Sequence, residues 1–188
     1  MINLTELSDE LFYIEHLGLD ENTDCFTVNN PKGKGLESYF RKYAIRDEEE
    51  NIARTYVIKD NSSKEIVAYF TLRSGLITVS RGFLKGFDAI TGIELANFAV
   101  NDSYREVHDV IPRLGSYIFY TFILPLVKNI SCYVGAKLIY IYALPEDKLM
   151  SHYETMGFSR TSEKMERFVY SHVKPAYDKN CIFMIRKI

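Results

Sequence analysis

Four consecutive residues, Arg113-Leu114-Gly115-Ser116, stand where a polar segment ends and an apolar, helix-like segment begins. The start of a helix has backbone N–H groups without partners and a partial positive charge, so it attracts anions such as phosphate. Gly115 permits close approach to the backbone, Arg113 offers a charge-assisted contact, and Ser116 offers a hydroxyl donor. These residues are therefore a candidate diphosphate site; the alternative is an ordinary helix cap beside an exposed arginine.

Two further side chains are of the types that transfer protons. Glu94 lies between two apolar residues of a β-like segment, where partial desolvation would raise the pKa of its carboxyl from about 4.3 toward that of a general base. Tyr153 lies in a helix-like segment and carries a phenol that can donate a proton. The alternatives are a solvent-facing or ion-paired glutamate and a core tyrosine that shares an apolar stripe with Leu149 and Met156.

The composition predicts a single cytoplasmic domain over residues 1–188. A chain of 188 residues with 47% hydrophobic content can build a continuous core. Lys plus Arg (23) nearly balance Asp plus Glu (25), so no global field attracts nucleic acid or anionic membranes. The N-terminus lacks the pattern of a secretion signal, and the most apolar run, Tyr117 to Val127, is shorter than the roughly 20 residues of a membrane-spanning helix.

The cysteines and histidines predict no metal site and no disulfide. Cys25, Cys132 and Cys181 are odd in number and far apart, so we expect buried, reduced thiols. The histidines show no ligand spacing, and we expect surface or structural roles for His108 and His152.

The first half of the chain predicts the beginning of a sheet and one helix. A short strand is expected at Cys25 to Val28, and Leu36 to Ala44 has the spacing of an amphipathic helix, which ends in the solvated run Asp47 to Glu50. Arg54 to Lys59 and Glu65 to Leu72 flank a turn and predict an antiparallel hairpin.

The second half predicts alternating strands and helices. The expected strands are Ile93 to Val100, Lys137 to Leu144, Glu166 to Tyr170 and Cys181 to Arg186, and the expected helices are Gly115 to Val127 and Pro145 to Met156. Pro125 is expected to break the first of these helices and Gly157 to end the second, while Asn29 to Gly35 and Ser80 to Gly86 are expected loops. The order β-α-β-β-β-α-β-α-β-β predicts a mixed α/β domain with helices covering a sheet.

This order, together with three segments, resembles the GNAT N-acetyltransferase superfamily over nearly the whole chain. Glu94-Leu-Ala-Asn-Phe-Ala-Val100 is similar to the family's fourth strand. Arg113-Leu-Gly-Ser116 is similar to its pyrophosphate loop, although Arg113 stands where the family has its first glycine. Ser151-His-Tyr-Glu-Thr-Met-Gly-Phe158 matches the Tyr-Glu-x-x-Gly-Phe signature of its fourth helix.

The resemblance implies a GNAT-type fold, with a mixed, mostly antiparallel central sheet flanked by helices. It also implies transfer of an acetyl group from acetyl-coenzyme A to an amine. The residues implied to bind this cosubstrate are Phe98, Ala99, Val100, Arg113, Leu114, Gly115 and Ser116. Tyr153 is implied as the acid that protonates the departing thiolate, and Glu94 as the base that deprotonates the amine.

Several alternatives remain open at this point. Cys25 to Gly75 resembles the GNAT toxins that acetylate aminoacyl-tRNA, and only in that case is a nucleic-acid partner expected, bound through the local cations Lys32, Lys34, Arg41 and Lys42. A non-catalytic acyl-coenzyme A sensor on the same fold is a rival. The aromatic residues Tyr117, Phe119, Tyr120 and Phe122 are expected in the core or in the contact of a homodimer.

Overall fold

The computed structural model describes residues 3–80, 87–109, 111–172 and 181–188, so most of the predicted loop at Ser80 to Gly86 lies outside the described residues. The chain divides into two compact units, Met1–Arg73 with Leu95–Leu126 and Ser74–Glu94 with Val127–Ile188. Strands β3 (Ile66–Ser80) and β4 (Phe87–Val100) each run through both units.

Besides its parts of β3 and β4, the first unit holds the elements from η1 to η3. They are η1 (Leu4–Leu7), β1 (Phe12–His16), η2 (Pro31–Gly33), α1 (Lys34–Lys42), α2 (Ala44–Glu49), β2 (Arg54–Asp60), α3 (Asp102–Val107), α4 (Leu114–Ile118) and η3 (Phe119–Ile123). Helix α5 (Leu124–Val134) begins in this unit and ends in the second. The second unit also holds β5 (Leu138–Ala143), α6 (Asp147–Thr155), β6 (Ser159–Arg160), α7 (Glu163–His172) and β7 (Ile182–Lys187).

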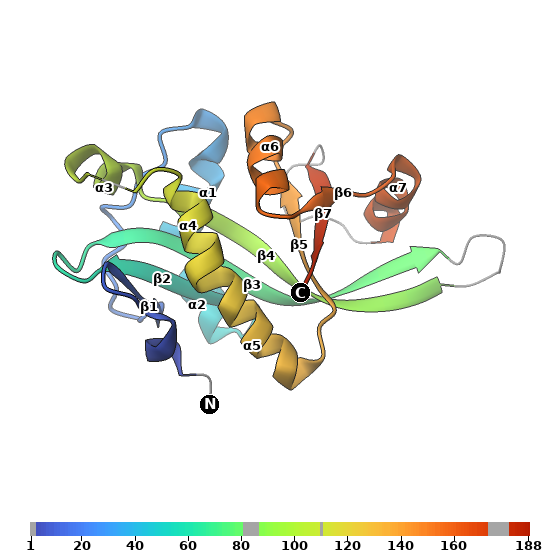
Figure 1. The fold of residues 1–188 in the computed structure, drawn as a ribbon, viewed down its shortest axis with the longest axis horizontal. Coiled ribbons are helices and arrows are strands. Elements are labelled where there is room, and N and C mark those ends of the chain that lie inside the picture. Colours follow the sequence, from blue (N-terminus) through green and yellow to red (C-terminus); the bar gives the residue numbers. More distant parts are fainter. Residues whose placement is uncertain (1–2, 81–86, 110, 173–180) are drawn as a thin grey trace. The chain divides into compact units, whose positions relative to one another are not determined.

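The strands form a seven-stranded sheet in the order β1-β2-β3-β4-β5-β7-β6. The pairings β1/β2, β2/β3, β5/β7 and β6/β7 are antiparallel, and β4 pairs with β5 in parallel. In the first unit, α4 crosses one face of β2 and β3 while α1 lies on the other face (Figure 1). The fold class predicted from the sequence, a mixed and mostly antiparallel sheet flanked by helices, is confirmed.

The predicted hairpin is confirmed as β2 and β3, and alternation along these strands explains how both faces are covered. Val57 and Tyr69 belong to the cluster that also contains Phe40 of α1, whose ring stacks on Tyr69 at 4.2 Å between centroids. The intervening residues point to the opposite face, and Tyr56 stacks on Phe70 there at 5.1 Å. Both faces of the hairpin are therefore apolar and packed.

The helix predicted to break at Pro125 instead continues from Leu114 to Val134. The turn before the proline is π-helical, and Leu124 donates its backbone N–H to the carbonyl of Phe119, five residues earlier. Proline cannot donate a backbone hydrogen bond, and its ring needs space against the preceding turn. The wider π turn makes room for the ring and tolerates the missing donor. The predicted break was wrong because the π turn lets the helix continue through Pro125.

The same helix is long and apolar enough to cross a membrane by length and composition alone. Its contacts in the first unit are those of a core helix. Phe119 and Phe122 are fully buried, and Tyr117 donates a hydrogen bond to Asp9 at 2.6 Å and packs edge-on against Phe12. Of the four aromatic residues expected in the core or in a dimer contact (Tyr117, Phe119, Tyr120 and Phe122), only Tyr120 is exposed, at 45%.

Cys25 to Val28 is not a strand. Its backbone groups are satisfied by side chains from elsewhere in the first unit: Asn101 accepts from the Thr27 N–H at 3.0 Å, and Glu37 accepts from the Val28 N–H at 2.9 Å. Arg41 donates to the Phe26 carbonyl at 2.6 Å. Side-chain partners thus replace a strand ladder. Cys25 and Cys132 are also exposed rather than buried, whereas Cys181 is buried as predicted.

The predicted strand Glu166 to Tyr170 is helical and belongs to α7. Met165 and Val169, four residues apart, both contact the core of the second unit, which is the spacing of a helix face. Glu166 is 7% exposed, accepts from the Phe183 N–H at 3.1 Å and pairs with Arg160 at 3.0 Å. Strands β1 and β6 were not predicted; β6 has only two residues, too few for a periodic signal.

Candidate functional site

The predicted diphosphate site lies at the first turn of α4. Arg113 immediately precedes the helix in the left-handed conformation, with φ 59° and ψ 41°, and its own side chain does not cap the helix start. Leu114 is buried, Gly115 and Ser116 are half-buried, and Arg113 is exposed. Amides at a helix start have no partners within the helix, so those of Leu114 to Ser116 suit an anionic acceptor, and an exposed guanidinium stands beside them.

The end of β4 is fixed by Asn101, which follows it directly. Its backbone N–H donates to the Val67 carbonyl at 2.8 Å, and its side-chain amide donates to the Ile66 carbonyl at 2.8 Å. Ala99 is buried, while Phe98 and Val100 are half-buried. These contacts set the position of the Phe98 to Val100 backbone, which was predicted to bind the cosubstrate.

Glu94 is half-buried on β4. The parallel register runs from Gly92, opposite Leu138, to Glu94, opposite Tyr140. Residues that are opposite in register share a face of the sheet, so Glu94 lies on the face of β5 that carries Tyr140 and Tyr142. Burial and then the negative charge of Glu94 raise the pKa of Tyr142.

Tyr153 is half-buried on α6. Its ring packs edge-on against Phe158, with 5.7 Å between centroids. The contact depends on the sharp end of the helix, where Gly157 adopts φ +82° and the Phe158 N–H donates to the Tyr153 carbonyl at 3.1 Å. Burial raises the pKa of Tyr153 to about 12, so its phenol keeps its proton at neutral pH.

The two histidines near these residues differ in their surroundings. His108 stacks on Tyr104 at 4.3 Å between centroids, and its Nε2 lies 2.6 Å from Glu65. This pairing fits the structural role expected for it. His152 is half-buried, with its ring centroid 6.3 Å from that of Tyr153.

The candidate residues thus fall into two sets. The first unit carries the groups suited to anion and backbone recognition, from Phe98 to Val100 and from Arg113 to Ser116. The second unit carries the two groups suited to proton transfer, Glu94 and Tyr153. Each remains a predicted site residue.

Sequence reasoning missed an aromatic cluster on the Glu94 face of the second unit. Tyr140, Tyr142 and Phe183 lie within 6.1 Å of one another between ring centroids, and Tyr142 also contacts Tyr170 of α7. The Tyr170 hydroxyl is buried without a hydrogen-bond partner among the described residues. The alternation Tyr-Ile-Tyr in β5 was the available signal, because it places both tyrosines on one face.

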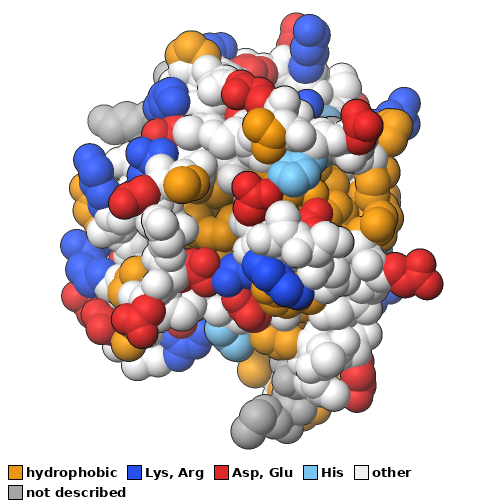
Figure 2. Space-filling view, turned by 90° about the vertical axis from the view of Figure 1, so that its left-hand side faces the viewer, with side chains coloured by type: hydrophobic (Ala, Val, Ile, Leu, Met, Phe, Trp, Pro, Cys, Tyr) orange, Lys and Arg blue, Asp and Glu red, His pale blue; other side chains and the backbone are white. Residues whose placement is uncertain are grey.

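Two of the four cations of the predicted basic patch pair with one carboxylate. Glu37 pairs with Lys34 at 2.8 Å and with Arg41 at 3.5 Å, and these contacts lower the pKa of Glu37, with the Lys34 hydrogen bond as the largest cause. On the face shown in Figure 2, basic and acidic side chains are interspersed rather than gathered by sign. The charge pattern there adds no strong attraction for phosphate backbones.

No protein-family model matches the chain, and no curated protein matches it. Solved structures of bacterial toxins do match. A tyrosine-to-phenylalanine mutant of KacT is 15% identical with a TM-score of 0.67, covering 95% of each chain. AtaT complexed with acetyl-methionyl-tRNAfMet is 18% identical with a TM-score of 0.64, covering 92% of this chain and 93% of that one.

A mutant AtaT bound to the C-terminus of the antitoxin AtaR and acetyl-CoA is 17% identical with a TM-score of 0.64, covering 94% of both chains. At such identities the likeness establishes architecture rather than activity. The chain therefore has the GNAT-type fold shared by KacT and the AtaT toxin.

Proposed function

We propose that the chain is an N-acetyltransferase that moves an acetyl group from acetyl-coenzyme A to a primary amine. The observation that carries the proposal is the start of α4 directly after the exposed, left-handed Arg113. Backbone amides and an arginine suit the coenzyme's diphosphate, and the GNAT-type fold supports the same assignment.

The proposed reaction is a direct attack in a ternary complex. Glu94 accepts a proton from the ammonium, and the neutral nitrogen attacks the thioester carbonyl. Backbone N–H groups of Phe98 to Val100 stabilise the oxyanion. As the carbon–sulfur bond breaks, the thiolate receives the Tyr153 proton, and the nitrogen loses its second proton to the Tyr153 phenolate. The amide and coenzyme A are the products, and Glu94 returns its proton to solvent.

A second candidate acceptor is the amino group of an aminoacyl-tRNA, in a cytoplasmic toxin. The likeness to AtaT in complex with acetyl-methionyl-tRNAfMet favours it. The ion pairs of Lys34 and Arg41 with Glu37 count against strong electrostatic binding of tRNA. The rival is a sensor that binds the coenzyme without turnover.

The test combines calorimetric titration with acetyl-coenzyme A and measurement of thiol release with a panel of amines. We expect binding in the range of ordinary substrates, about 1 μM to 1 mM, and thiol release with at least one amine. Arg113→Gln should weaken binding about tenfold, because a charge-assisted contact is lost.

The matched control is Arg105→Gln, because Arg105 is 53% exposed in its side chain and pairs with Asp102 in the same unit. It should bind the coenzyme as the unaltered chain does. Tight binding with no turnover would favour the sensor, and no binding would refute the proposal. Inhibition of translation in vitro only when acetyl-coenzyme A is present would select aminoacyl-tRNA as the acceptor.

A further inference from the structure

Strand β3 loses its partner on one side before it ends. Its antiparallel register with β2 ends at Leu72, which lies opposite Arg54, while β4 is its neighbour on the other side. From Ser74 onward, β3 continues beside β4 as a two-stranded ribbon (Figure 1). Among the described residues, no strand pairs with the outer edge of β3 in this ribbon.

The direction of the backbone groups on this edge follows from the alternation along the strands. Leu17, directly after β1, donates its N–H to the Thr55 carbonyl at 2.9 Å, so the backbone groups of Thr55 face β1. Those of the next residue, Tyr56, then face β3, and those of Phe70, which lies opposite Tyr56, face β2. Every second residue from Phe70 onward has the same direction, which in the ribbon gives Ser74, Leu76 and Thr78.

The edge lacks two features that commonly protect the edge of a sheet, namely charged side chains and proline. β3 is 15 residues long, and Ser74 to Ser80 contains neither a charged residue nor a proline. Ser74 and Leu76 are also exposed. A long, uncharged edge strand that is open to solvent pairs readily with another chain.

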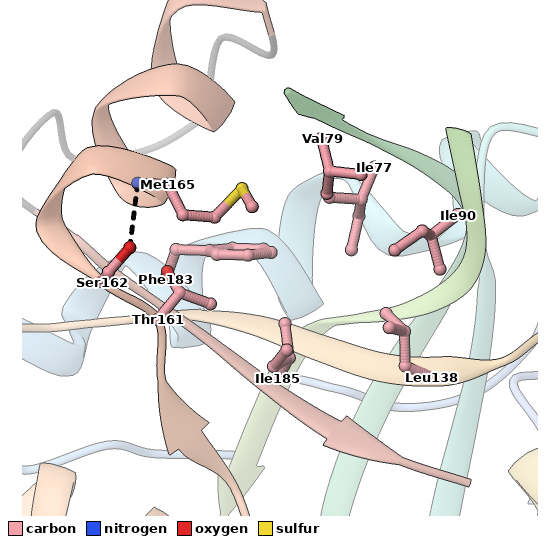
Figure 3. A pocket seen from close by; sticks show the side chains of 9 residues that line it. All are labelled: Ile77, Val79, Ile90, Leu138, Thr161, Ser162, Met165, Phe183 and Ile185. Atoms are coloured by element: carbon pink, nitrogen blue, oxygen red, sulfur yellow. Dashed lines mark hydrogen bonds between the residues drawn. The ribbon is translucent and has the colours of Figure 1, made fainter. Parts of the chain in front are cut away.

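One face of the ribbon is exposed beside this edge. A Cβ atom on Gly75 or on Gly92 would meet the Tyr140 ring, so both glycines lie on the face that packs against the second unit's core. Their neighbours Leu76 and Thr91 therefore share the opposite face. Three residues on the packed face line an apolar cavity (Figure 3): Ile77, Val79 and Ile90.

The end of α5 extends the exposed face. Thr91 donates its hydroxyl to the Gly135 carbonyl at 2.7 Å, and Gly135 directly follows Val134, the last residue of α5. Val134 is exposed, and Leu76 is 54% exposed. Exposed apolar side chains that lie beside an open strand edge mark an interaction surface.

We propose that two copies of the chain pair through this edge, with β3 of one copy antiparallel to β3 of the other about a two-fold axis at Leu76. This register sets Leu76 opposite its own copy and Ser74 opposite Thr78, so residues with outward backbone groups meet one another. Three such pairs exchange about six backbone hydrogen bonds. The inference does not depend on the proposed acetyl transfer.

The properties of the edge fit a second copy. Pairing of one edge with itself uses the same surface on both chains, and it stops at two copies because both edges are then occupied. No like charges are opposed, since Arg73 lies opposite Val79 and the residues between them are uncharged. The Leu76 side chains meet on one face of the joined sheet and bury each other.

The first measurement is sedimentation equilibrium of the full chain. We expect a dimer at about 50 μM chain, and Leu76→Lys should raise its dissociation constant at least about 100-fold, because two cations then replace two leucines at the axis. The matched control is Leu11→Lys, since Leu11 is 50% exposed in the first unit. It should leave the dissociation constant unchanged, and circular dichroism establishes that each variant is folded.

The second measurement tests the backbone pairing without changing an apolar side chain. Ser74→Pro removes an outward N–H and leaves the hydrogen bonds to β4 in place, because the backbone groups of Ser74 point away from β4. It should weaken the dimer about tenfold or more, since each interface loses two hydrogen bonds. Ser74→Ala keeps the N–H and should dimerise as the unaltered chain does.

The third measurement determines the register. In a chain without its exposed thiols (Cys25→Ser and Cys132→Ser), Leu76→Cys should form a disulfide-linked dimer under mild oxidation, because Cα atoms of directly opposed residues are about 5.5 Å apart. Ser74→Cys should not, because the two copies of Ser74 are separated by about 13 Å along the strands.

Three results would overturn the inference. They are a chain that stays monomeric at about 50 μM, a dimer that Leu76→Lys leaves intact, and equal cross-linking of Leu76→Cys and Ser74→Cys.

Discussion

Tyr153 combines a proton-donating group with a position that keeps it protonated. If it supplies the proton to the departing thiolate, Tyr153→Phe should lower kcat for thiol release about 10²- to 10⁴-fold. The affinity for acetyl-coenzyme A should stay unchanged, because the phenol acts on the leaving group. The control is Tyr133→Phe, a tyrosine of the same unit at 70% exposure, which should retain full activity.

The pKa of Tyr153 adds a prediction about pH. An acid acts only while protonated, so its contribution is lost as pH rises through its pKa. Burial raises the pKa of Tyr153 to about 12. At pH 10, where an ordinary tyrosine is half deprotonated, Tyr153 should therefore still be protonated and the rate should not yet fall. If the rate instead fell to half near pH 10, and this fall were missing from the residual activity of Tyr153→Phe, the raised pKa of Tyr153 would be contradicted.

At the residue scale, the sequence predicted candidates whose chemistry depends on local neighbours. The Arg113 to Ser116 segment lies at a helix start because an apolar run follows it directly. Tyr170 and Thr161 were missed, because their significance depends on burial without a partner, which no local pattern records.

At the element scale, a close approach fixes β3 against β5. A Cβ atom on Gly75 would lie 1.8 Å from the Tyr140 hydroxyl oxygen and 2.7 Å from Cζ. Gly75→Ala should therefore destabilise the fold by about 1–3 kcal/mol in urea unfolding, since the Tyr140 ring must move. Adding Tyr140→Phe should recover part of that loss, because the hydroxyl is the nearest atom.

The control for this substitution is Gly35→Ala. A Cβ atom there meets nothing within 4 Å, and the position is inside α1, where alanine is favoured by about 1 kcal/mol. Equal losses at the two positions would contradict the close approach.

A buried carboxylate ties α2 to the first unit's core. Asp47 is 5% exposed, accepts from the Tyr39 hydroxyl at 3.1 Å and lies 3.5 Å from Arg73. Asp47→Asn should cost about 1.5–3 kcal/mol in the free energy of unfolding, because the part-buried Arg73 guanidinium loses the charge of this carboxylate. Glu50→Gln is the control: it pairs with Arg46 at 4.0 Å on the surface, so it should change stability by less than about 0.5 kcal/mol. Equal losses in the two variants would show that the burial of Asp47 contributes nothing.

Elements with a strong internal period were predicted, and those defined by distant partners were not. The β2–β3 hairpin and β5 follow from alternation and β-branched content. Asp47 looked solvated because it begins an acidic run, and its partner Arg73 is 26 positions away. The strand expected at Cys25 failed for the same reason, because its partners Asn101 and Glu37 are outside any local window.

At the scale of the whole molecule, the fold class was predicted correctly, although the expected strands at Cys25 to Val28 and Glu166 to Tyr170 were wrong. The resemblance rested on segments whose spacing matched the order of elements, and the solved toxins share the architecture at 15–18% identity. Which amine is accepted cannot be predicted in this way, because substrate choice depends on side chains that line a site rather than on the order of elements.

The single-domain organisation remains a prediction, and continuity of the chain makes it testable. The boundaries between the two units fall inside β3, β4 and the helix Leu114–Val134. Neither unit can unfold without breaking an element that the other uses, so we expect one cooperative transition in urea. The chain lacks tryptophan, so Tyr43→Trp reports on the first unit and Tyr133→Trp on the second, at positions that are 44% and 70% exposed. Both probes and far-UV circular dichroism should give the same midpoint and slope, whereas two separate midpoints would show that the units are independent domains.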